Sequence, residues 1–267
     1  MTDKFWDSVR NPLAVRLRRG ELGLILQVKQ VQTPNIAMVA STCGYDAIYL
    51  DMQHTAISVA MAADMAVAAL SNGVCPIVRI AGHNFADALR LLDAGAFAIV
   101  IPGVTTADQA RAAVEYLRFA PIGKRSVAGT WPHFKYRPVP AGEAARVLNE
   151  QTLLTVMIED REGMANVEAI AAVPGIDVLH MGTNDLAADL GLQGDLGHDD
   201  LQGMFRTLVS ACRKHGKIAG VGGLSGSPQL AKTYIDLGAR FITGANEWSL
   251  LVGAARERAA FLRGLQP

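Results

Sequence analysis

The sequence predicts an α/β chain folded as a single (β/α)8 TIM barrel over residues 1–267. Eight short runs of aliphatic and β-branched residues alternate with longer amphipathic segments along almost the whole chain. The runs are continuously apolar, as expected for strands buried on both faces of a parallel sheet. No Ser/Pro-rich linker or block of charge divides them. A doubly wound open sheet is the alternative, because a strand count does not establish closure.

The expected elements follow this alternation in chain order. The strands are Gly23–Val28, Ala47–Leu50, Pro76–Val78, Ala98–Ile101, Leu154–Ile158, Val178–Met181, Ile218–Val221 and Phe241–Gly244. A short helix near Asn11–Arg19 comes first, and the other helices are Pro34–Cys43, Ser58–Ser71, Asn84–Asp93, Thr106–Leu117, Ala141–Gln151, Met164–Ala172, Asp199–His215, Pro228–Leu237 and Glu247–Leu262. Asn84 and Thr106 are expected N-caps, while Gly95, Gly216 and Gly238 follow helices where a left-handed residue is favoured.

One segment departs from the alternation. Pro121–Gln151, between the fourth and fifth strands, contains several prolines and Trp131 before its helix begins. A long irregular loop inside a compact barrel is usually functional, so we expect a wall or lid over the site, or a subunit contact. A solvated excursion is an equal alternative.

Composition narrows the classes of partner. The chain has 25 Lys+Arg and 25 Asp+Glu, so bulk charge favours neither nucleic acid nor an anionic membrane. Cys43, Cys75 and Cys212 are widely spaced and odd in number, which argues against a disulfide framework or a structural zinc site. No signal peptide is evident, because charges interrupt residues 1–19, and no later stretch reaches the ~18 apolar residues of a membrane span. We expect a cytoplasmic protein.

Five polar residues follow predicted strands, where the chemistry of a (β/α)8 barrel is located. Asp51 and His54 follow the second strand, and Arg79 ends the third. Glu159 ends the fifth, and Asp185 follows the sixth. A closed barrel would bring these side chains, distant in sequence, to one mouth.

Glu159 and Asp185 are candidate metal ligands. Glu159 follows four apolar residues, where an isolated charge costs several kcal/mol unless it is paired or metal-bound. Two convergent carboxylates suit an oxygen-preferring dication such as Mg2+ or Mn2+. The alternative is that Asp185 caps a helix at Leu186–Leu190 while Glu159 pairs with Arg161.

The other polar residues suggest acid/base chemistry. Asp51 could orient the His54 imidazole as a general base, and the Arg79 fork suits a carboxylate or a developing oxyanion. His180, on the sixth strand, is slightly better interpreted as a core histidine than as a site residue. GVGGLSG (Gly220–Gly226) could bind a phosphate or form a floor of small residues under a substrate.

These residues lie in motifs that resemble the HpcH/HpaI aldolase family, the metal-dependent class II pyruvate aldolases. The likeness covers nearly all of the chain from Gly23 onward. Its motifs are YLDMQH (Tyr49–His54), PIVR (Pro76–Arg79), LLDAGA (Leu91–Ala96), PIGKRS (Pro121–Ser126), IEDREGMAN (Ile158–Asn166), GIDVLHMGTNDLAADLG (Gly175–Gly191) and LGARFITGANEWSLL (Leu237–Leu251). The superfamily also holds citramalyl- and malyl-CoA lyase-like enzymes and Diels-Alderase-like relatives, so the resemblance indicates the carbon–carbon chemistry better than the substrate.

The resemblance implies a lyase that reversibly cleaves a 4-hydroxy-2-oxo acid through a metal-stabilised enolate. The products would be pyruvate, or a pyruvate-like 2-oxo acid, and an aldehyde. It also implies that Glu159 and Asp185 ligate Mg2+, Mn2+ or Co2+, and that Arg79 binds the keto oxygen. Asp51 and His54 would form the acid/base dyad.

The same resemblance implies where the substrate carboxylate binds and how subunits assemble. The carboxylate would lie against the backbone amides of Asn184 and Asp185, beside Gly182. The family's usual assembly is a hexamer, a trimer of dimers that exchange their last helix, here Glu247–Leu262.

Several departures from the family pattern put the aldehyde in doubt. Gln53 and Met157 stand where many members have Glu and Gln, and GTND replaces GPAD. A Schiff-base route is disfavoured, because only Lys29 of the seven lysines lies near the expected rim. Two other functions remain open. One is a phosphosugar isomerase or epimerase that uses Gly220–Gly226, and the other is a barrel that binds 2-oxo acids without turnover.

Overall fold

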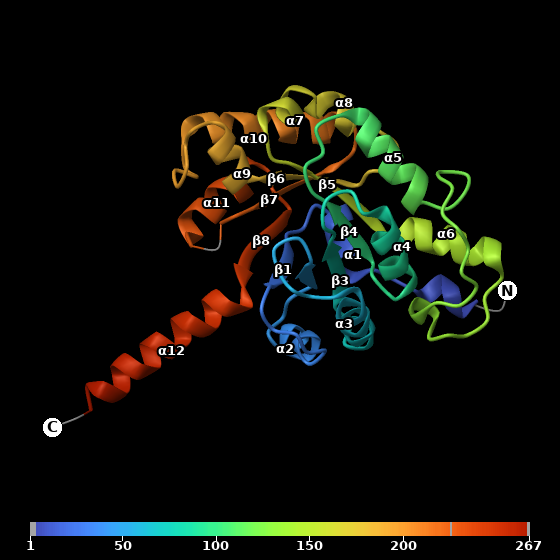
Figure 1. Cartoon of the computed structure of the whole chain (residues 1–267), viewed down its shortest axis with the longest axis horizontal. Helices are drawn as coiled ribbons and strands as arrows, with labels where there is room; N and C mark the ends of the chain where they lie inside the picture. Colours follow the sequence, from blue (N-terminus) through green and yellow to red (C-terminus); the bar gives the residue numbers. More distant parts are fainter. Residues whose placement is uncertain (1–3, 225, 266–267) are drawn as a thin grey trace.

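Eight parallel strands close into a barrel in the computed structural model, which describes residues 4–224 and 226–265 (Figure 1). Each strand pairs with its neighbours in chain order, and β8 returns to β1 with Gly23 beside Phe241. The predicted closed barrel is therefore confirmed and the open sheet is excluded. The strands are β1 (Gly23–Val28), β2 (Ala47–Asp51), β3 (Cys75–Arg79), β4 (Ala98–Ile101), β5 (Leu153–Ile158), β6 (Val178–Gly182), β7 (Ile218–Gly222) and β8 (Phe241–Asn246).

Helices surround the strands, with two short 3-10 turns at Phe5–Ser8 and Pro132–Phe134. The helices are α1 (Pro12–Arg18), α2 (Ile36–Thr42), α3 (Val59–Ser71), α4 (Phe85–Asp93), α5 (Ala107–Leu117), α6 (Ala141–Gln151), α7 (Arg161–Ala165), α8 (Val167–Ala171), α9 (Thr183–Asp189), α10 (Asp199–Lys214), α11 (Pro228–Leu237) and α12 (Glu247–Arg263). The two predicted N-caps are confirmed, because the Asn84 and Thr106 side chains each accept a backbone N–H from the first turn, at 3.3 Å. Gly95, Gly216 and Gly238 have the expected positive φ.

The single helix expected at Met164–Ala172 is instead two short helices, α7 and α8, which meet at Asn166. Asp160 accepts a hydrogen bond from the Gly163 N–H at 2.6 Å, and this cap starts α7 earlier than predicted. The Asn166 side chain donates to the Thr105 carbonyl at 2.8 Å, where the two helices join. Apolar periodicity does not reveal such a polar contact with another unit of the barrel.

The barrel interior is closed at the amino ends of its strands. Alternate strand residues such as Tyr49, Ile77 and Phe241 form one buried cluster with Leu13 and Leu17 of α1. The side chain of Asn11, just before α1, donates to the carbonyls of Phe97 and Gln151 and fixes the helix there. The barrel interior is open at the carboxyl ends of the strands, where the site of such a barrel is located.

The long segment between β4 and β5 packs near the amino ends of the strands, beside the N-terminal turn. Trp131 and Phe134 are buried against Phe119 and the apolar face of α6. The His133 Nε2 lies 3.2 Å from the Ala96 carbonyl, just before β4, and burial lowers the pKa of His133 to about 4. The expectation of a lid or wall over the site is therefore wrong, because aromatic packing holds the segment at the opposite end.

Helix α12 leaves the barrel after β8 and projects away from it (Figure 1). Several of its apolar side chains are more than half exposed, including Trp248, Leu251 and Phe261. Within residues 4–224 and 226–265, no helix combines the length and apolar character that crossing a bilayer requires.

Candidate active site

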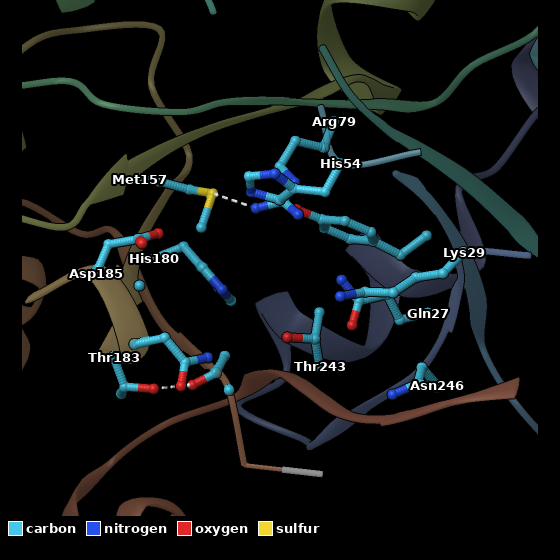
Figure 2. A pocket seen from close by; sticks show the side chains of 15 residues that line it. Gln27, Lys29, His54, Arg79, Met157, His180, Thr183, Asp185, Thr243 and Asn246 are labelled. Carbon is cyan, nitrogen blue, oxygen red and sulfur yellow. Dashed lines mark hydrogen bonds between the residues drawn. The ribbon is translucent and has the colours of Figure 1, made fainter. Parts of the chain in front are cut away.

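A pocket of about 350 Å³ opens among the carboxyl ends of the strands (Figure 2). Five predicted site residues line this pocket, namely His54, Arg79, Gly182, Asn184 and Asp185. The other lining residues are Gln27, Lys29, Tyr49, Met157, His180, Thr183, Gly222, Gly223, Thr243 and Asn246. The two remaining predicted residues, Asp51 and Glu159, lie in the wall just behind them.

Arg79 and Asp51 form a buried, two-pronged ion pair. The strand register places Asp51 at the end of β2 beside Arg79 at the end of β3. Arg79 Nε donates to Asp51 Oδ1 at 2.9 Å, and Nη2 donates to Oδ2 at 2.5 Å. Burial opposes ionisation of Asp51, but the hydrogen bonds and charge of Arg79 outweigh it and lower the pKa of the carboxyl. Arg79 Nη1 is left free of Asp51 and lies 3.9 Å from the Met157 sulfur (Figure 2).

The structure does not contain the side-chain pair of Asp51 and His54 that the sequence predicts. Asp51 Oδ1 accepts the backbone N–H groups of Gln53 and His54, at 3.2 and 3.3 Å. Among the described residues, no hydrogen bond joins the His54 ring to this carboxylate, whose two oxygens accept the fork of Arg79. The His54 ring is exposed at the pocket instead.

Glu159 and Asp185 bring two negative charges to one side of the site. Glu159 Oε1 accepts the Gly103 N–H at 2.7 Å, whereas the buried Oε2 has no hydrogen-bond partner among the described residues. Burial raises the pKa of Glu159, and the charge of Asp185 raises it further. A Cβ at residue 182 would lie 2.7 Å from Glu159 Oε2, so this wall requires Gly182.

The alternative partners considered for these acids are absent from the described residues. Arg161 bonds to Asp189, through its backbone N–H at 2.9 Å and its side chain at 2.6 Å to the carbonyl, and Glu159 accepts Gly103 instead. Asp185 lies exposed in the first turn of α9, and no hydrogen bond from a helix N–H to its side chain occurs in the described chain.

The two carboxylates fit a hard divalent cation. The buried Oε2 of Glu159 has no partner among the described residues, and the charge of Asp185 repels the Glu159 carboxylate. A dication would bind this oxygen and offset the repulsion between the two acids. In residues 4–224 and 226–265 there is no cluster of three or more His, Cys, Asp or Glu residues placed to hold a metal. Such a site suits Mg2+ or a similar ion, which keeps water and substrate oxygens as its other ligands.

His180 is buried, as expected for a core histidine, and it also forms part of the floor of the pocket. The ring is fully buried against Phe241, and burial lowers its pKa to about 3, so it is neutral. A Cβ at Gly220 or Gly222 would lie 2.8 or 2.7 Å from a nitrogen of this ring. These glycines therefore make room for His180, which agrees with a floor of small residues. Ser225 of the GVGGLSG segment lies outside the described residues.

Sequence reasoning did not select four polar residues that line the pocket, namely Gln27, Lys29, Thr243 and Asn246. They belong to β1, to β8 and to the residue after β1, which lie side by side where the barrel closes. Gln27 and Thr243 are isolated polar residues in otherwise apolar runs, and this was the available signal.

A comparison with known families decides between the possible uses of this pocket. Residues 29–254 match the model of the HpcH/HpaI aldolase/citrate lyase family. The chain belongs to this family. The match spans the barrel from the end of β1 into α12 and includes the two acids, the Asp51–Arg79 pair and His54. Enzymes of the HpcH/HpaI family generally depend on a divalent metal.

Two relatives that match almost the full length of the chain are named as aldolases. The chain is 34% identical to the 4-hydroxy-4-methyl-2-oxoglutarate aldolase tasA of Hapsidospora irregularis over 264 residues, 97% of each chain. It is 33% identical to a hydroxypyruvate/pyruvate aldolase of Pseudomonas aeruginosa over 259 residues, 96% of this chain and 94% of that one. These likenesses place the protein among the carbon–carbon lyases.

Solved HpcH/HpaI structures share the fold. A family protein from Burkholderia cenocepacia J2315 superposes with a TM-score of 0.83 at 30% identity, covering 95% of this chain and 99% of that one. The HpcH/HpaI aldolase from Desulfitobacterium hafniense DCB-2 gives a TM-score of 0.87 at 24% identity, over 95% and 97% of the chains. The second likeness supports the fold alone.

Proposed function

We propose that the protein is a divalent-metal-dependent aldolase. It reversibly cleaves a 4-hydroxy-2-oxo acid to pyruvate, or a pyruvate-like 2-oxo acid, and an aldehyde or ketone. The observation that carries this proposal is the buried, unpartnered Oε2 of Glu159 behind Gly182, in the wall of a pocket that Asp185 and Arg79 also line. Mg2+, Mn2+ and Co2+ all match the oxygen donors of the two acids.

In the cleavage direction, the bond between C3 and C4 breaks and its electron pair stays on the 2-oxo acid as an enolate. Glu159 and Asp185 would hold a dication, which would supply Lewis acidity that lowers the energy of this enolate. Arg79 contributes because Asp51 fixes two of its nitrogens, leaving Nη1 to donate to the enolate oxygen. The enolate then takes a proton at C3 to become the free 2-oxo acid.

His54 is placed to handle the proton of the C4 hydroxyl. Its ring is exposed at the pocket, where it can accept that proton directly or through water as the bond breaks. Asp51 does not orient the ring, so its role is to fix Arg79 and the backbone before His54. The substrate carboxylate lies against Gly182, Asn184 and Asp185, as the family resemblance implies.

Metal removal tests the proposed reaction. We expect EDTA to abolish pyruvate release from 4-hydroxy-4-methyl-2-oxoglutarate, followed by a coupled dehydrogenase assay, and added Mg2+, Mn2+ or Co2+ to restore it. Incubation with EDTA already saturated with the metal under test controls for effects of the chelator itself. Full turnover in excess EDTA would contradict the metal role.

We also propose that subunits associate through α12, as a hexamer of three helix-exchanged dimers. The exposed apolar side chains of α12 support this proposal, because an exposed apolar surface of this kind marks a site of contact with another protein surface. Exposed Leu24 on β1 and Met38 and Val39 on α2 offer further apolar surface.

A further inference from the structure

Lys29 brings a positive charge to the side of the pocket across from Asp185 (Figure 2). It comes directly after β1, is half-buried, and lines the pocket with Gln27 and Asn246. The proposed cleavage steps place the enolate between Arg79 and the two acids, so they leave Lys29 without a function.

The backbone at Lys29 is held by Glu247, a buried acid that is the first residue of α12. Glu247 Oε1 accepts the N–H groups of Lys29, Gln30 and Val31 at 2.8, 2.5 and 2.9 Å. Hydrogen bonds to a charged acceptor are stronger than neutral ones, and three of them converge on one oxygen here. The backbone of Lys29 is therefore fixed beside the junction of β1 and β8, and its side chain extends from there.

The Lys29 ammonium is available to an anion. Arg79 has its counterion in Asp51, whereas no described carboxylate forms an ion pair with Lys29. Glu247 uses Oε1 for backbone groups, and its Oε2 has no partner among the described residues. The charge of Lys29 contributes to lowering the pKa of Asp51, so its field reaches the pocket interior.

We propose that Lys29 binds a carboxylate on the part of the substrate beyond C4, the part that leaves as the aldehyde or ketone. This inference rests on the proposed function and narrows its substrate class to 4-hydroxy-2-oxo acids with a second carboxylate. The 2-oxo acid end lies toward Asp185, and the amides of Gln27 and Asn246 supply neutral donors beside Lys29. The substrate would thus carry one negative charge toward each side of the pocket.

Two acceptors of similar size but different charge test this role in the direction of synthesis. Glyoxylate carries a carboxylate, and glycolaldehyde carries a hydroxymethyl group in its place. In each reaction the pyruvate methyl carbon loses one proton and bonds to the aldehyde carbon, whose oxygen gains one proton. We expect Lys29→Met to lower kcat/KM for glyoxylate about 10-fold or more and that for glycolaldehyde less than about 2-fold. Lys29→Arg should restore most of the glyoxylate activity, because it keeps the charge.

The control is Lys232→Met, which removes an exposed lysine that pairs with Asp236 on α11. It should leave both acceptors unaffected. Equal losses for the two acceptors in Lys29→Met, or no loss for glyoxylate, would overturn the inference. Hydrogen–deuterium exchange at the pyruvate methyl separates this result from a failure of the proposed function. Exchange should be unchanged in Lys29→Met, whereas its absence in the wild-type protein would overturn the proposed function and this inference with it.

Discussion

Asp51 pairs with Arg79, whereas the sequence predicts that it pairs with His54. The motif YLDMQH places the histidine three residues after Asp51, and that spacing indicates a dyad. Chain spacing says nothing about Arg79, which reaches Asp51 only because β2 and β3 are adjacent in register. The guanidinium fork matches a carboxylate better than one imidazole nitrogen does, so Arg79 binds the buried acid.

Asp51→Asn should destabilise the protein by about 3 kcal/mol near neutral pH, because it leaves a buried Arg79 charge without its counterion. The folded-state pKa of Asp51 is lowered, so its contribution is complete above the ordinary aspartate pKa and is lost as pH falls through the lower folded value. The difference from wild type should therefore narrow in acid. Urea unfolding from about pH 7 down to about pH 2 measures this.

The matched control is Asp108→Asn, which breaks an Asp–Arg pair on the exposed face of α5. An exposed pair contributes little, so this variant should unfold like the wild type. An Asp51→Asn variant as stable as Asp108→Asn at neutral pH would contradict the structural role given to the buried pair.

The strand-end positions of the two candidate metal ligands, Glu159 and Asp185, were predictable from the sequence, but their surroundings were not. The signal for Glu159 is an acid directly after an apolar run at a strand end. The choice of Gly103 as its partner instead of Arg161 depends on the loop after β4, which has no local pattern. The sequence places Lys29 near the rim, but its fixed position depends on Glu247, which is distant in sequence.

Secondary-structure elements were predicted within one or two residues where apolar runs and caps agree. The largest difference in strands is at β8, which extends to Asn246 instead of Gly244 and so carries polar residues to the pocket. The prediction of one helix at Met164–Ala172 was wrong, because Asn166 interrupts it and donates a hydrogen bond to Thr105 in another unit of the barrel. The periodicity of apolar residues indicates the buried face of a helix, but it does not reveal a polar side chain that bonds to another element.

Helix α12 carries a prediction at the scale of one element. Sedimentation equilibrium should give a mass several times the 28.4 kDa of one chain. Leu251→Glu with Phe261→Glu places charge on the exposed apolar surface of α12, and we expect this variant to dissociate toward the monomer.

Tyr116→Glu on α5 is the control, because it introduces the same charge at an exposed aromatic residue outside α12. Its mass should equal that of the wild type. A wild-type protein that sediments as a monomer at micromolar concentration would contradict the assembly proposed for α12.

At the scale of the whole molecule, the barrel separates stability from chemistry. The amino ends of the strands are sealed by α1 and the aromatic cluster around Trp131, whereas the carboxyl ends hold the polar pocket. Sequence alternation predicts this division, since polar residues follow the strands and apolar residues fill them. The location of the segment between β4 and β5 was not predictable, because its aromatic residues suit either end of a barrel.

The central claim is that Glu159 and Asp185 hold a dication that promotes enolate formation from a 2-oxo acid. Proton NMR in D2O tests it most directly, by following loss of the pyruvate methyl signal with no aldehyde present. We predict exchange by the wild-type protein with Mg2+, and rates about 100-fold lower after chelation or in Glu159→Gln, because several kcal/mol of enolate stabilisation are removed. Exchange at the wild-type rate in Glu159→Gln, or no exchange with Mg2+ in the wild type, would contradict the account.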